Sequence, residues 1–224
     1  MALVTSRTIS LLAQGGTIDT NGFDSSFSGA IIGTGGLTKV GTGTLILSGT
    51  NTYTGGTMIN AGILNVSADN NLGNSAGGLT FNGGTLQFGA SFNLAATRAI
   101  TLNGGGGAVD TNGFSTTISQ GITGTGGLTK LGSGTLILTG ANAYTGPTAI
   151  NAGTLQAAAP NAFSPSSAFT VASGAILNLN IFNQTIGSLA GSGNVMLGSA
   201  TLTTGKRQHE HDVLRHYLWQ RRVY

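Results

Sequence analysis

Pairs of carboxylates cleave glycosidic bonds in many enzymes, and this chain offers few acids for that chemistry. Its first 205 residues contain Asp19, Asp24, Asp69 and Asp110. The two carboxyl groups of a glycosidase lie about 5 to 10 Å apart. Asp19 and Asp110 are equivalent positions of an internal repeat and should lie roughly 20 Å apart in a chain that coils at the strand spacing. Asp24 and Asp69 have no equivalents, so we predict no catalytic residues and no enzyme.

The side chains that could bind a metal gather in residues 206–224, which have the sequence KRQHEHDVLRHYLWQRRVY. The candidate ligands are His209, Glu210, His211, Asp212 and His216. They lack the His-Glu-x-x-His spacing that places two imidazoles on one helix face, and no second cluster completes a site. We therefore predict no metal site.

Two glycine-rich segments invite comparison with ligand-binding loops. Residues 33–36 read Gly-Thr-Gly-Gly, but no Gly-Lys-Ser/Thr ending or helix pattern follows, as a phosphate-binding loop requires. Residues 104–110 miss the spacing of the calcium-binding glycine-rich repeat by one residue. Both patterns predict turns, and we expect no cofactor.

A long internal repeat organises the chain. Residues 33–64 return as residues 124–155, displaced by 91 positions and identical at 24 of 32. The same displacement pairs Asp19–Phe23 with Asp110–Phe114. Self-similarity on this scale indicates a repetitive architecture.

The displacement also sets the expected organisation of the chain. We predict one repetitive unit over residues 1–205, with copies near 6–96 and 97–172 and a partial copy at 173–205. The sequence begins inside a copy, so we expect it to be an internal piece of a longer protein or a late start of its reading frame. Residues 206–224 differ abruptly in composition, and we interpret them as a frameshift product.

The composition favours an ordered but unusual surface. Glycine accounts for 39 of 224 residues and charged residues for only 7%, against roughly 25% in average proteins. Regularly placed apolar residues, 39% of the chain, with only three prolines, allow a continuous core. No apolar run reaches the roughly 20 residues of a membrane-spanning helix.

The net charge of +3 belongs to the end of the chain. Residues 1–205 hold four basic and four acidic side chains, whereas residues 206–224 add five basic and two acidic ones. A neutral body gives no reason to expect a nucleic-acid partner. The absence of cysteine excludes disulfides and thiolate metal sites.

Apolar residues favour alternate positions, as in Leu45 and Leu47 or Leu136 and Leu138, which predicts short strands. Gly-Gly, Asn-Gly and Thr-Gly pairs between them predict turns. Short strands could form a sandwich or a solenoid, and the long repeat favours a solenoid, whose turns contact only their neighbours. At roughly 20 residues a turn, the body would form about ten turns, a rod of about 50 Å.

The repeated motif GTGGLTKxGxGTLILxGxNxYTGxTxINAGxL closely resembles the autotransporter-associated β-strand repeat, also called the passenger-associated transport repeat. Its positions run from Gly35, Gly36, Leu37 and Lys39 to Gly62, and recur from Gly126 to Gly153. The resemblance covers about residues 6–205. It implies a right-handed parallel β-helix in the passenger of a type V secreted protein of a Gram-negative bacterium, exported through a C-terminal outer-membrane β-barrel.

The resemblance implies a structural passenger segment at the cell surface that aids its own secretion. Two alternatives stay open: an adhesin that binds glycans or proteins of a host or neighbouring cell, and a polysaccharide-active enzyme. Inward packing of Tyr53 and Tyr144 would favour the scaffold, whereas their exposure would favour adhesion. Neither a signal peptide nor a barrel is recognisable in the sequence, and we expect the chain to self-associate end to end through unpaired strand edges.

Overall fold

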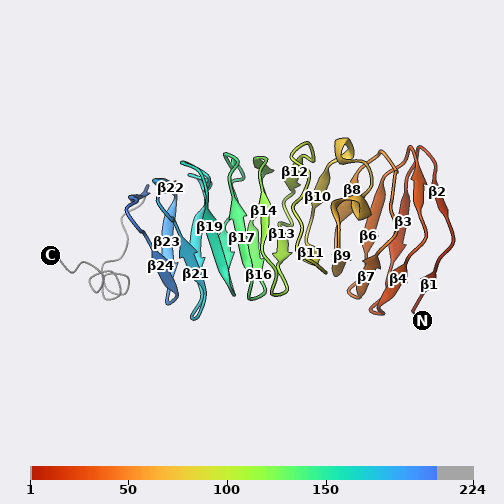
Figure 1. The fold of residues 1–224 in the computed structure, drawn as a ribbon, viewed down its shortest axis with the longest axis horizontal. Helices are drawn as coiled ribbons and strands as arrows, with labels where there is room; N and C mark the ends of the chain where they lie inside the picture. Colours follow the sequence, from red (N-terminus) through yellow and green to blue (C-terminus); the bar gives the residue numbers. More distant parts are fainter. Residues whose placement is uncertain (1, 206–224) are drawn as a thin grey trace.

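The structure, a computed structural model, describes residues 2–205 as an elongated coil of short strands (Figure 1). Every strand pair is parallel, and the longest sheet contains ten strands, one for each turn of the coil. The helical pieces of the described part are two 3-10 turns, η1 (Asp69–Leu72) and η2 (Ser75–Gly77). The predicted all-β parallel solenoid of about ten turns is confirmed. The expected frameshift product and metal-ligand candidates at 206–224 lie outside the described residues.

Strands lie on three faces of the rod, and between residues 37 and 110 successive strands alternate between two of these faces. The ten-stranded sheet contains β1 (Val4–Thr5), β4 (Ser25–Phe27), β7 (Thr44–Leu47), β9 (Ile63–Val66), β11 (Thr85–Phe88), β13 (Gly107–Asp110), β16 (Leu128–Leu131), β18 (Thr148–Ile150), β20 (Ala168–Val171) and β23 (Ser188–Gly191). The six-stranded sheet contains β3 (Gly16–Asp19), β6 (Leu37–Val40), β8 (Thr57–Ile59), β10 (Leu79–Phe81), β12 (Ile100–Leu102) and β15 (Ile122–Gly124).

The remaining strands form one five-stranded sheet and two pairs. The five-stranded sheet contains β14 (Thr116–Ile118), β17 (Thr135–Leu138), β19 (Thr154–Ala157), β21 (Ile176–Asn178) and β24 (Asn194–Met196). The pairs are β2 (Ile9–Leu11) with β5 (Ile31–Gly33) and β22 (Gln184–Ile186) with β25 (Leu202–Thr204).

Equivalent strands of the two copies lie on different faces. Strand β6 belongs to the six-stranded sheet, whereas its equivalent β16 belongs to the ten-stranded sheet. Within the six-stranded sheet, four steps lead from β6 through β8, β10 and β12 to β15, and β16 is the next strand along the chain. The displacement of 91 residues therefore corresponds to four turns plus one strand, and each copy is rotated by one face.

The core is a stack of apolar side chains that point inward at alternate positions. Leu45, Leu64, Leu86 and Val109 lie in register across β7, β9, β11 and β13, and all are buried. Burying such a side chain stabilises a fold by roughly 1.5–3 kcal/mol. Each turn thus adds apolar contacts to the turns before and after it, which makes the solenoid continuous.

Candidate functional site

Two lysine side chains of the repeated motif are enclosed inside the rod. Lys39 in β6 and Lys130 in β16 are each 0% exposed. Buried and half-buried positions alternate along β6, so Lys39 shares the inward side with Leu37. A charged side chain is almost never fully buried unless it is paired. The partners of the two ammonium groups therefore decide their role.

Each ammonium group is held by oxygens from three successive turns. The acceptors of Lys39 Nζ are Thr20 Oγ1 at 2.9 Å and the carbonyl oxygens of Val40 at 2.7 Å, Gly41 at 2.7 Å and Ala61 at 3.2 Å. The acceptors of Lys130 Nζ are Thr111 Oγ1 at 2.9 Å and the carbonyl oxygens of Leu131 at 2.8 Å, Gly132 at 2.7 Å and Ala152 at 3.1 Å. Each lysine clamps neighbouring turns together from within.

Glycine is required beside each clamp. Gly62 and Gly153 both have a φ of +64°, a left-handed conformation that L side chains rarely adopt. A Cβ added to Gly62 would lie 2.9 Å from Lys39 Nζ and closer still to the carbonyl oxygen of Gly41. The backbone turn and the space around the ammonium group therefore both exclude a side chain there.

Burial lowers the pKa of both lysines because the charged form loses its hydration. The pKa of Lys130 falls to about 8, although Asp110 acts in the opposite direction. The pKa of Lys39 is also lowered by burial, and Asp19 opposes that shift. A lowered pKa alone would suit a nucleophilic amine, but both side chains are enclosed and fully engaged with the backbone. The arrangement serves to join turns.

Two further polar positions of the motif also point inward. Asn51 accepts a hydrogen bond from the Ile31 backbone N–H at 2.8 Å and donates to the carbonyl oxygen of Asn71, so it links three turns. Asn142 makes the equivalent contacts in the second copy, to Ile122 and Ala162. Each asparagine therefore joins backbone groups of the turns before and after its own.

The two tyrosines of the motif are buried rather than displayed. Tyr53 and Tyr144 are each 0% exposed, and their hydroxyls lie 2.6 Å from the hydroxyls of Thr57 and Thr148, respectively. Burial raises the pKa of each tyrosine to about 12. Both tyrosines therefore pack inward, the arrangement that favours a scaffold.

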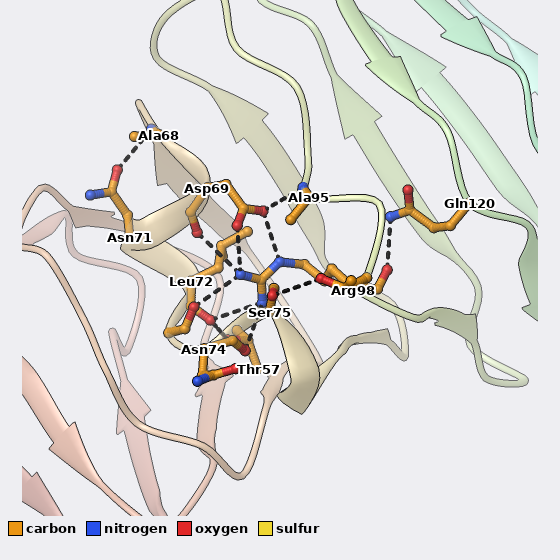
Figure 2. A network of polar contacts seen from close by, with 12 residues as sticks. Thr57, Ala68, Asp69, Asn71, Leu72, Asn74, Ser75, Ala95, Arg98 and Gln120 are labelled. Carbon is orange, nitrogen blue, oxygen red and sulfur yellow. Dashed lines mark hydrogen bonds and ion pairs between the residues drawn. The ribbon is translucent and has the colours of Figure 1, made fainter.

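An ion pair joins Asp69 of the first copy to Arg98 at the start of the second, and the positions 91 residues further on do not repeat it. Arg98 Nε donates to Asp69 Oδ1 at 2.9 Å, and a second guanidinium nitrogen reaches Asp69 Oδ2 at 3.0 Å (Figure 2). The guanidinium group also donates to the carbonyl oxygens of Leu72 and Gly73, so it ties η1 to the segment that leads into β12. The positions 91 residues further on hold Pro160 and Leu189.

The hydrogen bonds of Asp69 favour its ionised form. Burial opposes ionisation, but donation from Arg98 and from the Ala95 backbone N–H outweighs it and keeps the pKa of Asp69 lowered. From the sequence, Asp69 had no repeat equivalent and no assigned role. The structure places an arginine against it, which is the environment of a structural carboxylate.

The other acids of the described residues shape turns. Asp19 Oδ1 accepts from the Asn21 backbone N–H at 2.7 Å, and Asp110 Oδ1 accepts from that of Asn112 at 2.8 Å. Asp24 Oδ1 accepts from the Thr44 backbone N–H at 2.9 Å, which lowers its pKa. Asp19 lies on the six-stranded sheet and Asp110 on the ten-stranded sheet, so the two equivalents do not share a face.

Within residues 2–205, no group of three or more acidic, histidine or cysteine side chains is arranged to hold a metal ion. None of the helical pieces found there is long and apolar enough to span a membrane.

The two copies keep their interior and differ mainly outside. Eight aligned positions differ between residues 33–64 and 124–155. In the first copy they are Val40, Thr42, Ser48, Thr50, Thr52, Gly56, Met58 and Ile63, of which only Gly56 is buried. The shared residues include the clamping lysine, the linking asparagine, the buried tyrosine and the inward leucines.

The family described as passenger-associated-transport-repeat matches residues 37–66 and 128–157. Two segments of the chain therefore match this repeat. The matched segments run from β6 to the end of β9 and from β16 to the end of β19, so each repeat contains one lysine clamp, one linking asparagine and one buried tyrosine.

Part of the chain is also similar to an autotransporter. Over 91 residues it is 40% identical to the Adhesin BmaC autotransporter of Brucella suis biovar 1 (strain 1330). The match covers 41% of this chain but 3% of that relative, so the chain spans a small fraction of the relative's length. No solved structure matches the chain.

The repeat is evident from the sequence, but the role of its lysine in joining turns was not predicted. The signal was present, because Lys39 follows Leu37 by two residues and therefore falls on the apolar side of a strand. The Asp69–Arg98 pair left no comparable signal, since its residues are 29 positions apart and only Arg98 has a repeat counterpart, Arg7.

Proposed function

We propose that this segment is a structural scaffold in the surface-displayed passenger of an autotransporter, where turn-by-turn folding aids its secretion. The observation that carries the proposal is the division between the two repeats: the shared lysine and asparagine are buried and join turns, while seven of the eight differing positions are exposed or half-buried. Constant interior residues and variable surface residues are expected where the segment's role is to form the coil itself.

Local connectivity supports the folding part of the proposal. Each lysine clamp and each linking asparagine joins only neighbouring turns. In a solenoid built from nearest-neighbour contacts, folding can begin at one end and propagate. A turn that emerges outside the cell therefore finds its partners on the turn already folded.

We also propose that the segment is not catalytic. Its four described acids accept backbone N–H groups in turns or bind Arg98, which accounts for each by a structural contact. Catalysis by the whole protein is a separate question, because the chain covers 3% of the relative's length.

A second candidate function, adhesion at the cell surface, is favoured by the resemblance to a protein named as an adhesin autotransporter. In that case the outward residues of the coil, rather than its interior, would carry the recognition. The two candidates are compatible, since a rod that presents a binding surface is also a scaffold.

A display assay tests the scaffold proposal. The chain is placed as the passenger in front of a heterologous autotransporter translocator, and its surface level is measured by protease accessibility. Exchanging the outward residues Thr50 and Thr52 for the alanines of the second repeat should leave display unchanged. Lys39→Met should lower it several-fold. Unchanged display of the Lys39→Met chain, with its stability measurably reduced, would count against the proposal.

A further inference from the structure

Two shallow grooves occupy equivalent places in the two copies. The first encloses about 290 Å³ and the second about 350 Å³. Four lining residues of the first, Gly15, Gly36, Thr38 and Met58, correspond at a displacement of 91 to Gly106, Gly127, Thr129 and Ala149 in the second. The groove is thus a property of the repeat and is formed by successive turns of the coil.

Glycines form the floor of the first groove because stacked turns approach too closely for side chains. A Cβ on Gly15 would lie 2.7 Å from the carbonyl oxygen of Gly36, and one on Gly36 would lie 2.8 Å from that of Gly55. A column without side chains therefore runs along the rod and leaves backbone at the surface. It extends over four turns, or roughly 15–20 Å at the strand spacing.

Threonine hydroxyls border this floor in single file. Thr17 is in register with Thr38, Thr38 with Met58, and Met58 with Thr80, all at positions of the six-stranded sheet that are not buried. The spacing of neighbouring strands, about 4.8 Å, sets the period of the hydroxyls. The methionine interrupts the column once.

The grooves carry no charged side chain in their lining. The lysine of β6 follows the groove residue Thr38 in sequence, but its side chain points into the core. Nothing in this surface would attract an acidic polymer, and hydrogen bonding is the recognition it offers.

We propose that each groove binds a neutral, linear, β-linked polysaccharide that lies along the rod axis. A sugar ring in such an extended chain advances by a distance close to one strand spacing, so successive rings meet successive threonine hydroxyls and exposed peptide groups. The proposal deepens the adhesin candidate and rests on it. The first groove binds more tightly, because Thr17 is replaced by Ala108 in the second.

The rotation of the copies gives the grooves a collective role. The first lies over the six-stranded sheet and the second over the ten-stranded sheet, so tandem copies present the site on successive faces. Several weak sites on one rod raise the overall avidity for a surface without any new contact. The rod would hold a meshwork of polymer chains approached from any side.

The test uses the whole chain with cellohexaose as the neutral probe and polygalacturonate as the acidic one. The measurement is the NMR chemical shift of backbone amides. We expect cellohexaose at millimolar concentration to shift the amide signals of Gly36, Thr38, Gly127 and Thr129, and polygalacturonate to leave them unchanged. Shifts caused only by polygalacturonate, or no shift with cellohexaose, would overturn the proposal.

A variant pair localises the binding. Thr38→Glu places a charge in the first groove, and Thr117→Glu places one outside both grooves on the five-stranded sheet. Thr38→Glu should weaken binding at the first groove at least tenfold, whereas Thr117→Glu should not change it. Equal loss in both variants would refute the assignment. Surface display is measured in a separate assay. A failure to bind cellohexaose would therefore contradict the groove proposal without contradicting the scaffold proposal.

Discussion

The ammonium group of Lys130 donates a hydrogen bond of 2.9 Å to the hydroxyl of Thr111, which belongs to the preceding turn of the coil. The same lysine reaches the carbonyl oxygen of Ala152 on the following turn at 3.1 Å. One side chain therefore connects three turns, and the first copy repeats this arrangement at Lys39. In a fold with few long-range contacts other than those between neighbouring turns, such clamps set how firmly the turns are joined.

Replacing the clamp with an apolar side chain should destabilise the rod. Lys130→Met removes the donor of the Gly132 and Ala152 carbonyl oxygens, whereas the Leu131 carbonyl oxygen keeps the Thr111 backbone N–H. A buried acceptor without a partner costs about 1–3 kcal/mol. We expect the free energy of unfolding in urea to fall by about 3 kcal/mol. Thr129→Met, one residue away on the outer side of the same strand, is the matched control and should change it by less than about 0.5 kcal/mol. Equal effects of the two substitutions would contradict the clamp.

The sequence predicts the coil well, but it does not predict on which face of the rod each strand of a copy lies. Period-two spacing and glycine pairs identify strands and turns, and the 91-residue displacement indicates stacking. The displacement does not give the length of a turn, which varies: Leu37 pairs with Thr57, 20 residues on, and Thr57 with Leu79, 22 residues on. The rotation by one face follows from these lengths and so becomes visible only in the registers.

The interior polar contacts were harder to predict for a different reason. Lys39 and Asn51 carry polar groups that composition alone assigns to the surface, yet backbone carbonyls and N–H groups of neighbouring turns satisfy them inside. The Asp69–Arg98 pair depends on how the η1 turn meets a strand one turn later, which no repeat signals.

The stability of the rod should peak in mildly alkaline solution. Because burial lowers the pKa of Lys130 to about 8, the unfolded state binds more protons between pH 8 and 10.5, and the free energy of unfolding rises with pH there. Burial raises the pKa of Tyr53 and Tyr144 to about 12, so above pH 10 the unfolded tyrosines ionise first and stability falls.

Urea unfolding at pH 7, 9, 10 and 11 measures this profile. We expect the free energy of unfolding to rise by about 2 kcal/mol from pH 7 to 10 and then to decline, because a tenfold difference in proton affinity between the folded and unfolded states corresponds to about 1.4 kcal/mol. Lys130→Met should reduce the rise and keep the decline. A free energy of unfolding that stays unchanged from pH 7 to 10 in the unmodified chain would show that the lysine titrates at its ordinary pKa.

Breaking the Asp69–Arg98 ion pair should cost more than removing both of its members. Arg98→Met leaves Asp69 without its partner, and because the Asp69 side chain is 24% exposed, we expect a loss below the about 3–5 kcal/mol typical of fully buried charges. Arg98→Met combined with Asp69→Ala should recover part of that loss. Thermal unfolding of the two single variants and the double variant gives the coupling, and strictly additive losses would argue against a direct pair.

Cysteine trapping tests most directly whether each copy is rotated by one face around the rod. The chain has no cysteine of its own, so engineered pairs can be read without background. Thr80 is in register with Thr101, whereas Ala108, the repeat equivalent of Thr17, is in register with Thr85 on another face. Thr80→Cys with Thr101→Cys should form a disulfide within the chain under mild oxidation, because neighbouring strands meet the distance that a disulfide needs. Thr80→Cys with Ala108→Cys should not, and rapid cross-linking of that pair instead would mean that the copies stack on the same face.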